Sequence, residues 1–535
     1  MLHGVTCIRR LLSKESQPPV QAVLASGVLA RLVVLLDCGD AKVQFEAAWA
    51  ITNIASTEFT AAVVEAGAVP PLVRNMAAAD ANLREQSLWC IGNVAGESPA
   101  LRDLLLTTPG CLEALLQNLA YPSNVGLLRN ATWTLSNLCR GKPSPAPASV
   151  ASMLPALAHL ATSADLAVLV DALWGLSYLT DGDDKTIDAV VAFPGVVRRC
   201  VELMAHEALT VVTPALRIIG NLISGTDRQT QAAVEAQALR AIVPLLTNAK
   251  RNIRREACWA VSNVAAGTPQ QISAMMLVPG LVQGVIHNLR SAEWVVRKEA
   301  CWVVFNVATT GAPEHVRQLV AAEAIEPLAA MLESDDPRIL CVALDAVAAV
   351  LEAARKLGEE TSSSVGIAFE EAGALDSLDN LQTFGDLDVY NKALGIVEKF
   401  FSPAEEDEDG GGGGGAPDGG DDDNVPAAAL ALVQQQAGMA GFGGAGGGGG
   451  APMPFGGFGA APQASAAAAF GMGGPGVAFG FGAERSANAV APGAAGGGKG
   501  FLTPPAAAAP SAGFGAQQPA VPAAPAFNFG AFSFT

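Results

Sequence analysis

The chain has 535 residues and a formal net charge of −19. This acidic balance argues against non-specific binding to nucleic acid or anionic membranes, which require basic surfaces, and it suits a protein with basic partners. Half of the residues are hydrophobic, but only 6% are aromatic and 16% are charged, against about a quarter charged in an ordinary domain. Such averages indicate that the chain contains parts of unlike composition.

The cysteines and the N-terminal segment indicate the cellular compartment of the protein. The nine cysteines form no C-x-x-C pair, and their number is odd. In a long chain whose first 17 residues lack an apolar signal-peptide core, this pattern predicts buried, reduced thiols. Before residue 404 there is no stretch of about 18 uncharged apolar residues, so no spanning helix is expected. We therefore expect a soluble protein of the cytosol or nucleus.

Residues 1–404 contain an internal repeat. Six tryptophans are separated by 40, 44, 41, 85 and 43 residues, and Arg217 divides the double step into 43 and 42. A period of about 42 residues is typical of HEAT and armadillo repeats. Between Gly or Pro turns, apolar residues recur at i, i+3 and i+4, which predicts stacked helical units that share one core. The tryptophans are Trp49, Trp89, Trp133, Trp174, Trp259 and Trp302.

The composition changes near residue 404. Residues 405–423 form an acidic, Gly-rich linker that carries −9, and residues 424–535 form a Gly/Ala/Pro/Phe-rich tail that carries +1, which leaves −11 for residues 1–404. The tail shows neither helical nor strand periodicity, and its glycines make ordering entropically costly. We therefore expect three regions, a repeat solenoid over 1–404, the linker, and a disordered tail.

A polar residue, usually asparagine, follows each tryptophan or its substitute by four positions, one turn along the same helix face. Large aromatic residues are mostly buried, so core packing is the first alternative. A buried amide, however, needs partners for its donors and acceptors, and Leu or Ala would serve a core position better. We therefore expect an exposed inner groove. The pairs are Trp49/Asn53, Trp89/Asn93, Trp133/Asn137, Trp174/Tyr178, Arg217/Asn221, Trp259/Asn263 and Trp302/Asn306.

The spacing of this ladder suggests an extended peptide as ligand. Stacked helices lie about 8–10 Å apart and an extended chain rises about 3.3 Å per residue, so the amides can bond a peptide backbone at every second or third residue. Slots between indole rings suit the stems and charged heads of Lys or Arg. A single acid on a helix is usually a solvated charge, but four acids repeat at three residues before the marker and favour a basic peptide. These acids are Glu46, Asp171, Glu256 and Glu299; Glu97 and Asp181 add acids at the far end.

Several segments resemble importin-α, the armadillo adaptor of nuclear import. They are residues 45–56 (FEAAWAITNIAS), 132–140 (TWTLSNLCR), 213–221 (TPALRIIGN) and 298–302 (KEACW), and the resemblance covers about residues 5–402. It implies an all-α, right-handed armadillo-repeat superhelix (α-solenoid) of about nine to ten repeats. It also implies an adaptor in cytoplasm and nucleus that binds the Lys/Arg-rich nuclear localisation signals of cargo proteins, for import with importin-β. The unit over residues 365–402 resembles the last repeat, which in that family contacts the export receptor.

The resemblance also implies two peptide sites. The major site is expected at Trp49, Asn53, Thr60, Trp89, Asn93, Glu97, Trp133, Asn137, Asp171 and Trp174. The minor site is expected at Arg217, Asn221, Thr230, Glu256, Trp259, Asn263, Glu299, Trp302 and Asn306. Glu97 stands where the family usually has Asp, and the segment between Asn53 and Thr60 is short by about two residues and lacks the usual glycine.

The two ends of the chain depart from the family pattern. The chain starts inside the first repeat, without the basic importin-β-binding segment, so we expect it to bind cargo but not to recruit importin-β through that arm; a truncated gene reading would look the same. In the tail, eight phenylalanines precede Gly. These pairs resemble nuclear-pore repeats and suggest the pore as a further location, although drift in a Gly/Ala-rich tail is the simpler explanation. Phe527 to Gly530 resembles the short C-terminal element of the family.

No enzyme or metal signature stands out. The chain has no G-x-S-x-G, P-loop or H-E-x-x-H motif, and its five histidines have no metal-ligand spacing. We therefore expect no enzyme, no cofactor, and no direct binding of nucleic acid or membrane. An armadillo scaffold for adhesion or signalling is the alternative function. Such scaffolds favour a basic groove for acidic ligands, so the sign of charge along the groove discriminates between the two.

Overall fold

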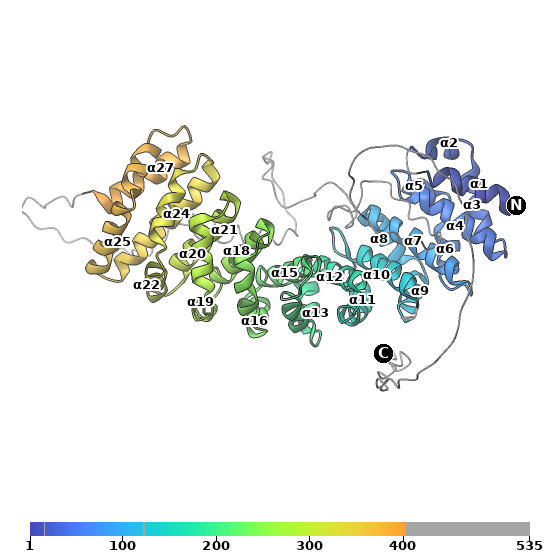
Figure 1. Ribbon diagram of the computed structural model, residues 1–535, viewed down its shortest axis with the longest axis horizontal. Helices are drawn as coiled ribbons and strands as arrows, with labels where there is room; N and C mark the ends of the chain where they lie inside the picture. Colours follow the sequence, from blue (N-terminus) through green and yellow to red (C-terminus); the bar gives the residue numbers. More distant parts are fainter. Residues whose placement is uncertain (15–16, 121–123, 403–535) are drawn as a thin grey trace, which may run out of the picture. The chain divides into compact units, whose positions relative to one another are not determined.

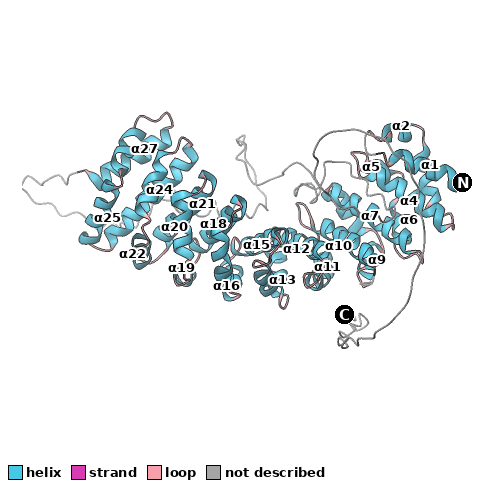
Figure 2. Cartoon of the chain, viewed as in Figure 1, coloured by secondary structure: helices cyan, strands magenta, loops and turns pink. Residues whose placement is uncertain are grey.

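The computed structural model describes residues 1–14, 17–120 and 124–402. Every regular element in these ranges is a helix (Figure 2). Successive helices lie next to one another in chain order, from α1 to α27 (Figure 1). The predicted helical solenoid is therefore confirmed. The linker over 405–423 and the tail over 424–535 lie outside the described residues and stay predictions.

A long helix closes each repeat, and ten such helices occur in the described ranges. We call them third helices, because in most units two shorter helices precede them. Each packs against the third helix of the next unit, which makes one continuous row. The third helices are α1 (Leu2–Leu12), α4 (Ala41–Ala55), α7 (Ala81–Glu97), α10 (Val125–Cys139), α12 (Leu166–Thr180), α15 (Leu209–Ile223), α18 (Arg251–Ala265), α21 (Trp294–Thr310), α24 (Pro337–Lys356) and α27 (Leu387–Ile396), which a π-helical turn, η3 (Val397–Phe401), continues.

Two shorter helices complete most units, and α11 (Pro147–Leu160) replaces both before α12. The first helices are α2 (Val20–Ala25), α5 (Thr60–Glu65), α8 (Pro99–Thr107), α13 (Asp184–Ala192), α16 (Asp227–Glu235), α19 (Pro269–Met276), α22 (Pro313–Ala321) and α25 (Glu359–Glu371). The second helices are α3 (Val28–Leu35), α6 (Val69–Asn75), α9 (Cys111–Asn118), α14 (Val196–Leu203), α17 (Ala238–Ile242) with η1 (Val243–Thr247), α20 (Leu281–Ser291), α23 (Ile325–Ala329) with η2 (Ala330–Glu333), and α26 (Ala374–Leu381).

Local signals in the sequence explain where these helices begin. The turn before the second helix uses a left-handed residue, for example Gly195 or Gly280, both at φ 82°, where a side chain would be strained. These are the Gly turns that the sequence predicts. Most third helices begin at an Asp or Asn whose side chain accepts a backbone N–H, which contributes about 1 kcal/mol each. The capping residues are Asp40, Asp80, Asn124, Asp165, Asp336 and Asp386.

Buried Leu, Val, Ile and Ala side chains form one core that runs through all units. Six cysteines belong to it, and burial raises the pKa of Cys90 to about 12, so its thiol is unreactive at neutral pH. The prediction of buried thiols is wrong for Cys7 and Cys38, which are exposed. Cys7 lies on α1, and Cys38 lies in the turn after α3.

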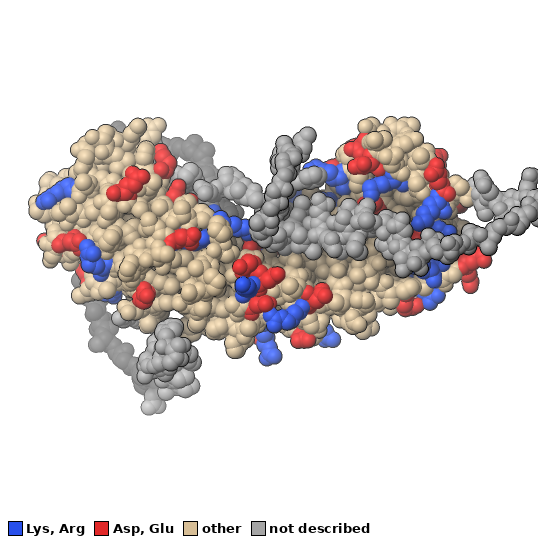
Figure 3. Space-filling view, turned by 180° about the vertical axis from the view of Figure 1, so that it is seen from behind, with Lys and Arg blue, Asp and Glu red and all other residues tan. Residues whose placement is uncertain are grey.

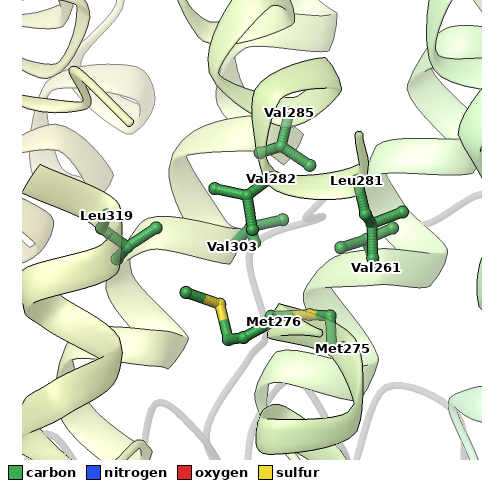
Figure 4. Close-up of a pocket in the computed structure, with 8 residues that line it drawn as sticks. All are labelled: Val261, Met275, Met276, Leu281, Val282, Val285, Val303 and Leu319. Atoms are coloured by element: carbon green, nitrogen blue, oxygen red, sulfur yellow. The ribbon is translucent and has the colours of Figure 1, made fainter. Parts of the chain in front are cut away.

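The core leaves little space for a small molecule. An apolar cavity of about 10 Å³ lies between α18, α19, α20, α21 and α22, where Val, Leu and Met side chains point toward one another (Figure 4). That volume is at the lower limit for holding a single water molecule. Of the described helices, none alone is long and apolar enough for a membrane span, although the bent pair α19 and α20 passes by length and composition. In the same ranges no three His, Cys, Asp or Glu side chains are grouped as metal ligands.

Polar side chains join the first helices of neighbouring units. Gln229 donates to the carbonyl oxygen of Asp184 (3.2 Å), and Gln271 donates to that of Asp227 (2.9 Å). His315 takes the same position on α22. It accepts the backbone N–H of Ala312 at Nδ1 (3.0 Å), and its Nε2 lies 3.1 Å from Ser273 Oγ. An imidazole that accepts at Nδ1 must be unprotonated there.

We expect His315 to make stability depend on pH. Burial lowers the pKa of His315 below 6.5, although the charge of Glu314 opposes this. Its stabilising contribution is complete above the unfolded pKa of about 6.5 and is lost as pH falls through the lower folded pKa. Between pH 7.5 and 5.5, thermal unfolding of the wild type should shift downward more than that of His315→Gln. This variant copies Gln229 and Gln271 at the same position, so the cap remains. Equal shifts in both proteins would contradict the assignment.

Candidate functional site

The predicted ladder residues all lie on third helices, in a row that runs along the described units. Five of the six tryptophans are half-buried, and Trp302 is only 7% exposed. Two of the indoles contact the preceding third helix. A Cβ added to Gly92 on α7 would collide with the ring of Trp133 on α10, and one added to Gly220 on α15 would collide with Trp259 on α18. These two tryptophans are therefore packing elements as well as walls of the row.

Four of the six ladder asparagines tie neighbouring third helices together. The Nδ2 of each of these four donates to the carbonyl oxygen of the residue just before the polar ladder residue of the preceding unit. Asn93 donates to Thr52 (3.3 Å), Asn137 to Gly92 (3.0 Å), Asn221 to Ser177 (3.2 Å) and Asn306 to Ser262 (2.8 Å). The last three asparagines are buried, with at most 8% exposure. The predicted exposure of the amides is thus too high, because the sequence does not reveal this bond between units.

In Asn93, Asn137 and Asn306 the bond between units uses one of the two N–H groups of the amide. One N–H and the carbonyl oxygen remain, which is what one peptide unit of an extended ligand requires. Asn221 donates to Thr180 Oγ1 as well (3.2 Å). Asn263 has a buried Nδ2 without a hydrogen-bond partner among the described residues. A buried, unsatisfied amide costs free energy, so at this rung a ligand carbonyl would be stabilising.

The four acids that lie three residues before a ladder position fall into two classes, paired and unpaired. Glu46 is paired with Arg9 (2.8 Å), and Glu256 is paired with Arg217. Asp171 and Glu299 form no ion pair within the described ranges, and burial raises the pKa of Glu299 above its usual range while Lys298 and Arg255 lower it. Burial raises the pKa of Asp171 to about 7. The role predicted for Glu256 as a ligand of peptide cations needs correction, since an arginine of this chain already occupies it.

Two predicted hydroxyls lie away from the row. Thr60 is fully buried, and its Oγ1 donates to the carbonyl oxygens of Ala55 and Thr57, both at 2.9 Å. Thr230 is 3% exposed and donates to Ile223 (2.9 Å). Both hydroxyls cap the ends of third helices and have no donor left for a ligand. Glu97, in contrast, is exposed at the end of α7, where a ligand can reach it.

Sequence reasoning missed three parts of the row. Arg9 on α1 and Ser13, the C-cap of that helix, stand one period before Trp49 and Asn53, and Asn53 Nδ2 donates to Ser13 Oγ (2.8 Å). Counting back 40 residues from Trp49 would have found them. Beyond Trp302 the equivalent positions hold Asp345 on α24, which is paired with Lys392 on α27. Glu85 on α7 accepts a hydrogen bond from Asn130 on α10 (3.0 Å). The sequence search missed it because it lies four residues before Trp89, whereas the four repeated acids lie three residues before a ladder position.

Outside the row, the described surface carries both signs of charge. On the side seen in Figure 3, Lys and Arg alternate with Asp and Glu, and large areas carry neither. Residues 359–388 hold eight acids and no Lys or Arg, whereas some neighbouring charges elsewhere are paired, as in Arg254 with Glu293 (2.5 Å) and Arg129 with Asp165 (2.7 Å). Such surface pairs are worth little. The acids of the row therefore differ from other acids in their place beside the tryptophans.

The close contact at Gly92 allows a test of the packing. We expect Gly92→Ala to displace the Trp133 ring, to lower the free energy of unfolding by on the order of 1 kcal/mol, and to weaken any ligand that uses this slot. The control is Gly366→Ala on α25, where an added Cβ meets nothing within 4 Å and the better helix propensity of Ala should stabilise by up to about 1 kcal/mol. Chemical denaturation measures both. A loss in both variants would show that the ring contact is not the cause.

Comparison with known proteins agrees with this architecture. Residues 16–56, 56–96, 98–140 and 226–266 match the Armadillo/beta-catenin-like repeat, and residues 364–412 match an Atypical Arm repeat. A solved engineered protein is similar in structure, with a TM-score of 0.66, 27% identity, and coverage of 75% of this chain and 95% of its own. The third-helix row and these matches define an armadillo-repeat protein.

Curated relatives identify the family more narrowly. Importin subunit alpha-1b of Oryza sativa subsp. japonica is 41% identical over 411 residues, which is 76% of each chain. Importin subunit alpha-3 of Arabidopsis thaliana is 41% identical over 409 residues, and importin subunit alpha-B of Dictyostelium discoideum is 40% identical over 406 residues, with 76% and 78% of those proteins covered. The chain belongs to the importin-α family, whose members are non-enzymatic adaptors of nuclear import that shuttle between cytoplasm and nucleus.

Proposed function

We propose that this chain binds Lys/Arg-rich nuclear localisation signals as extended peptides along the third-helix row, and so links cargo proteins to import with importin-β. The observation that carries the proposal is the combination of a Trp–Asn ladder with the unpaired acids Asp171 and Glu299 beside Trp174 and Trp302. An amide rung bonds any peptide backbone, whereas an indole wall beside a carboxylate selects a long cationic side chain. An adhesion or signalling scaffold, which favours a basic groove, fits these acids less well.

The proposal assigns two stretches of the row to peptides. The first uses α4, α7, α10 and α12, with the ladder positions from Trp49 to Trp174 and the exposed Glu97. The second uses α18 and α21, with Trp259, Asn263, Trp302, Asn306 and Glu299. Thr60 and Thr230 are left out because their hydroxyls donate to backbone carbonyl oxygens at the ends of third helices. Arg217 and Glu256 separate the two stretches because they are paired with each other.

Titration of a short Lys/Arg-rich peptide, followed by fluorescence anisotropy, tests the proposal. We expect a dissociation constant that is micromolar or tighter and that rises strongly between about 0.05 and about 0.5 M salt, since screening weakens exposed charge pairs. A peptide of equal length with Asp and Glu in place of Lys and Arg is the control. Equal binding of the acidic peptide, or affinity without salt dependence, would overturn the proposal.

Two further assignments belong to the same proposal, the first from the resemblance of the last repeat to its family counterpart and the second from the resemblance of the tail to nuclear-pore repeats. The last repeat, from about residue 365 to 402, is proposed to contact the export receptor. The FG pairs of the tail, outside the described residues, are proposed to contribute to any association with the nuclear pore. Pull-down with the purified export receptor or with FG-repeat protein, with residues 405–535 removed in the second case, tests each of them.

A further inference from the structure

Arg9 occupies the place in the row that a ligand cation would occupy in other units. Its Nε donates to Glu46 Oε2 (2.8 Å) and its Nη2 donates to Oε1 (3.3 Å). Its guanidinium carbon lies 4.2 Å from the centre of the Trp49 ring. The side chains of Arg9 and Glu46 are each only 15% exposed. Arg9 thus makes both interactions, cation–π and charge-assisted hydrogen bonds, that the proposed function assigns to a lysine or arginine of the peptide.

The same arrangement recurs where the ladder is interrupted. Arg217 stands in the place of a tryptophan on α15 and is paired with Glu256 on α18, whose side chain is 6% exposed. At the C-terminal end, Lys392 on α27 is paired with Asp345 on α24. Each of these pairs joins two consecutive third helices. Arg9 and Arg217 stand at ladder positions and pair with the acid three residues before the next one, whereas at the C-terminal end Asp345 stands at the ladder position and the cation lies on the following helix. The three pairs stand before, between and after the two stretches that carry unpaired acids.

A slot with its own cation is closed to a cation from outside. A peptide lysine that enters beside Trp49 on the α1 side would find the carboxylate of Glu46 already satisfied and would face the positive charge of Arg9. On the other side of the Trp49 ring, toward Trp89, no ion pair joins the described third helices α4 and α7. A basic peptide therefore gains from lysines placed over α4 to α12 and gains nothing from one placed over α1.

We propose that Arg9 is a resident cation that closes the first slot of the row and so sets how far a bound basic peptide extends toward the N-terminal end of the solenoid. This inference rests on the proposed function and deepens it, because it limits the length and register of the peptide that the first stretch selects. Arg217 and Lys392 are the corresponding closures at the middle and at the C-terminal end.

The test uses the full chain and a set of three peptides. The parent is a Lys/Arg-rich peptide that binds the wild type, and the others add two residues with one terminal lysine at either its N- or its C-terminal end. In the wild type, neither extension should tighten binding more than the same extension with alanine. In Arg9→Gln, one of the lysine extensions should tighten binding about tenfold, the value of one charge-assisted contact. Arg10→Gln is the matched control, because it removes the same charge from an exposed neighbour, and it should behave as the wild type.

The acid is tested by a second variant. In Arg9→Gln combined with Glu46→Gln, the gain from the added lysine should disappear, because the carboxylate that receives it is gone. If Arg9→Gln lowers the thermal stability of the protein, the single variant Glu46→Gln tests the inference instead. It leaves Arg9 without its counter-charge at the edge of the row, and the parent peptide should bind several-fold more weakly.

The outcomes separate this inference from the proposed function. If no basic peptide binds the wild type, the proposed function fails and the inference fails with it. If the parent binds, but the lysine extension tightens the wild type as much as Arg9→Gln, only the inference is overturned. An equal gain in Arg10→Gln would also overturn it, since the effect would then be one of general charge.

Discussion

Alanine at both Trp89 and Asn93 is expected to weaken binding of a Lys/Arg-rich peptide by about 100-fold or more, a loss typical of buried aromatic hot spots. Trp89 lies on α7 between Trp49 and Trp133, so its indole forms a wall of two adjacent slots. Asn93 supplies the rung one turn further along. Its Nδ2 bond to Thr52 (3.3 Å) also holds α7 against α4, so the variant loses ligand contacts and the spacing of the row.

The control for this double variant is Trp294→Ala. Trp294 is the first residue of α21, it is 38% exposed, and its ring carries Arg297 at 4.1 Å. It therefore loses an indole and a cation–π contact of the same kind, away from the ladder positions. Peptide affinity should stay unchanged in this variant, and circular dichroism should show helical content near that of the wild type for both. If the double variant binds the peptide as well as the wild type does, the ladder does not bind the peptide and this part of the proposed function is wrong.

The repeat period is the strongest guide in the sequence, because packing alone imposes it. A tryptophan that packs on the preceding third helix, as Trp133 does at Gly92, tends to recur at the same place in successive units. The spacing of Trp49, Trp89 and Trp133 is therefore enough to locate three third helices, although Arg217 interrupts the series. The glycines at the turns are equally readable, since a left-handed backbone at Gly195 or Gly280 excludes most side chains. The apolar periodicity then predicts the helices between these markers.

The burial and the pairing of the polar residues cannot be read in the same way. Nothing in the sequence around Glu256 shows that Arg217, 39 residues earlier, reaches its carboxylate. Hydrogen bonds between units join residues about one period apart, and the sequence does not say which acid or amide finds a partner. Thr60 illustrates the limit of resemblance as well. The residue matches by position, but its hydroxyl donates to the carbonyl oxygens of Ala55 and Thr57.

Peptide affinity is expected to rise with pH around neutrality because of Asp171. Burial raises the pKa of Asp171 to about 7, so the carboxyl is about half protonated there. A cationic side chain beside it favours the ionised form, and binding below the pKa therefore releases a proton. In the limit, affinity falls about tenfold per pH unit below the pKa. Between pH 8 and about 5.5 we expect a loss of roughly ten- to thirtyfold, measured with a histidine-free peptide that is blocked at both ends.

The free energy of unfolding should change with pH in the opposite direction to peptide affinity, and this second dependence helps to identify Asp171 as the titrating group. The folded pKa lies above the ordinary aspartate pKa of 3.8, so the folded state holds this proton more tightly than the unfolded state. The contribution of Asp171 to the free energy of unfolding therefore decreases as pH rises from about 4 through 7, whereas its contribution to peptide binding increases. Asp171→Asn should flatten both dependences. Glu97→Gln should lower affinity at every pH but keep the slope, because Glu97 is exposed at the end of α7. A slope that survives in Asp171→Asn would place the titrating group elsewhere in the row.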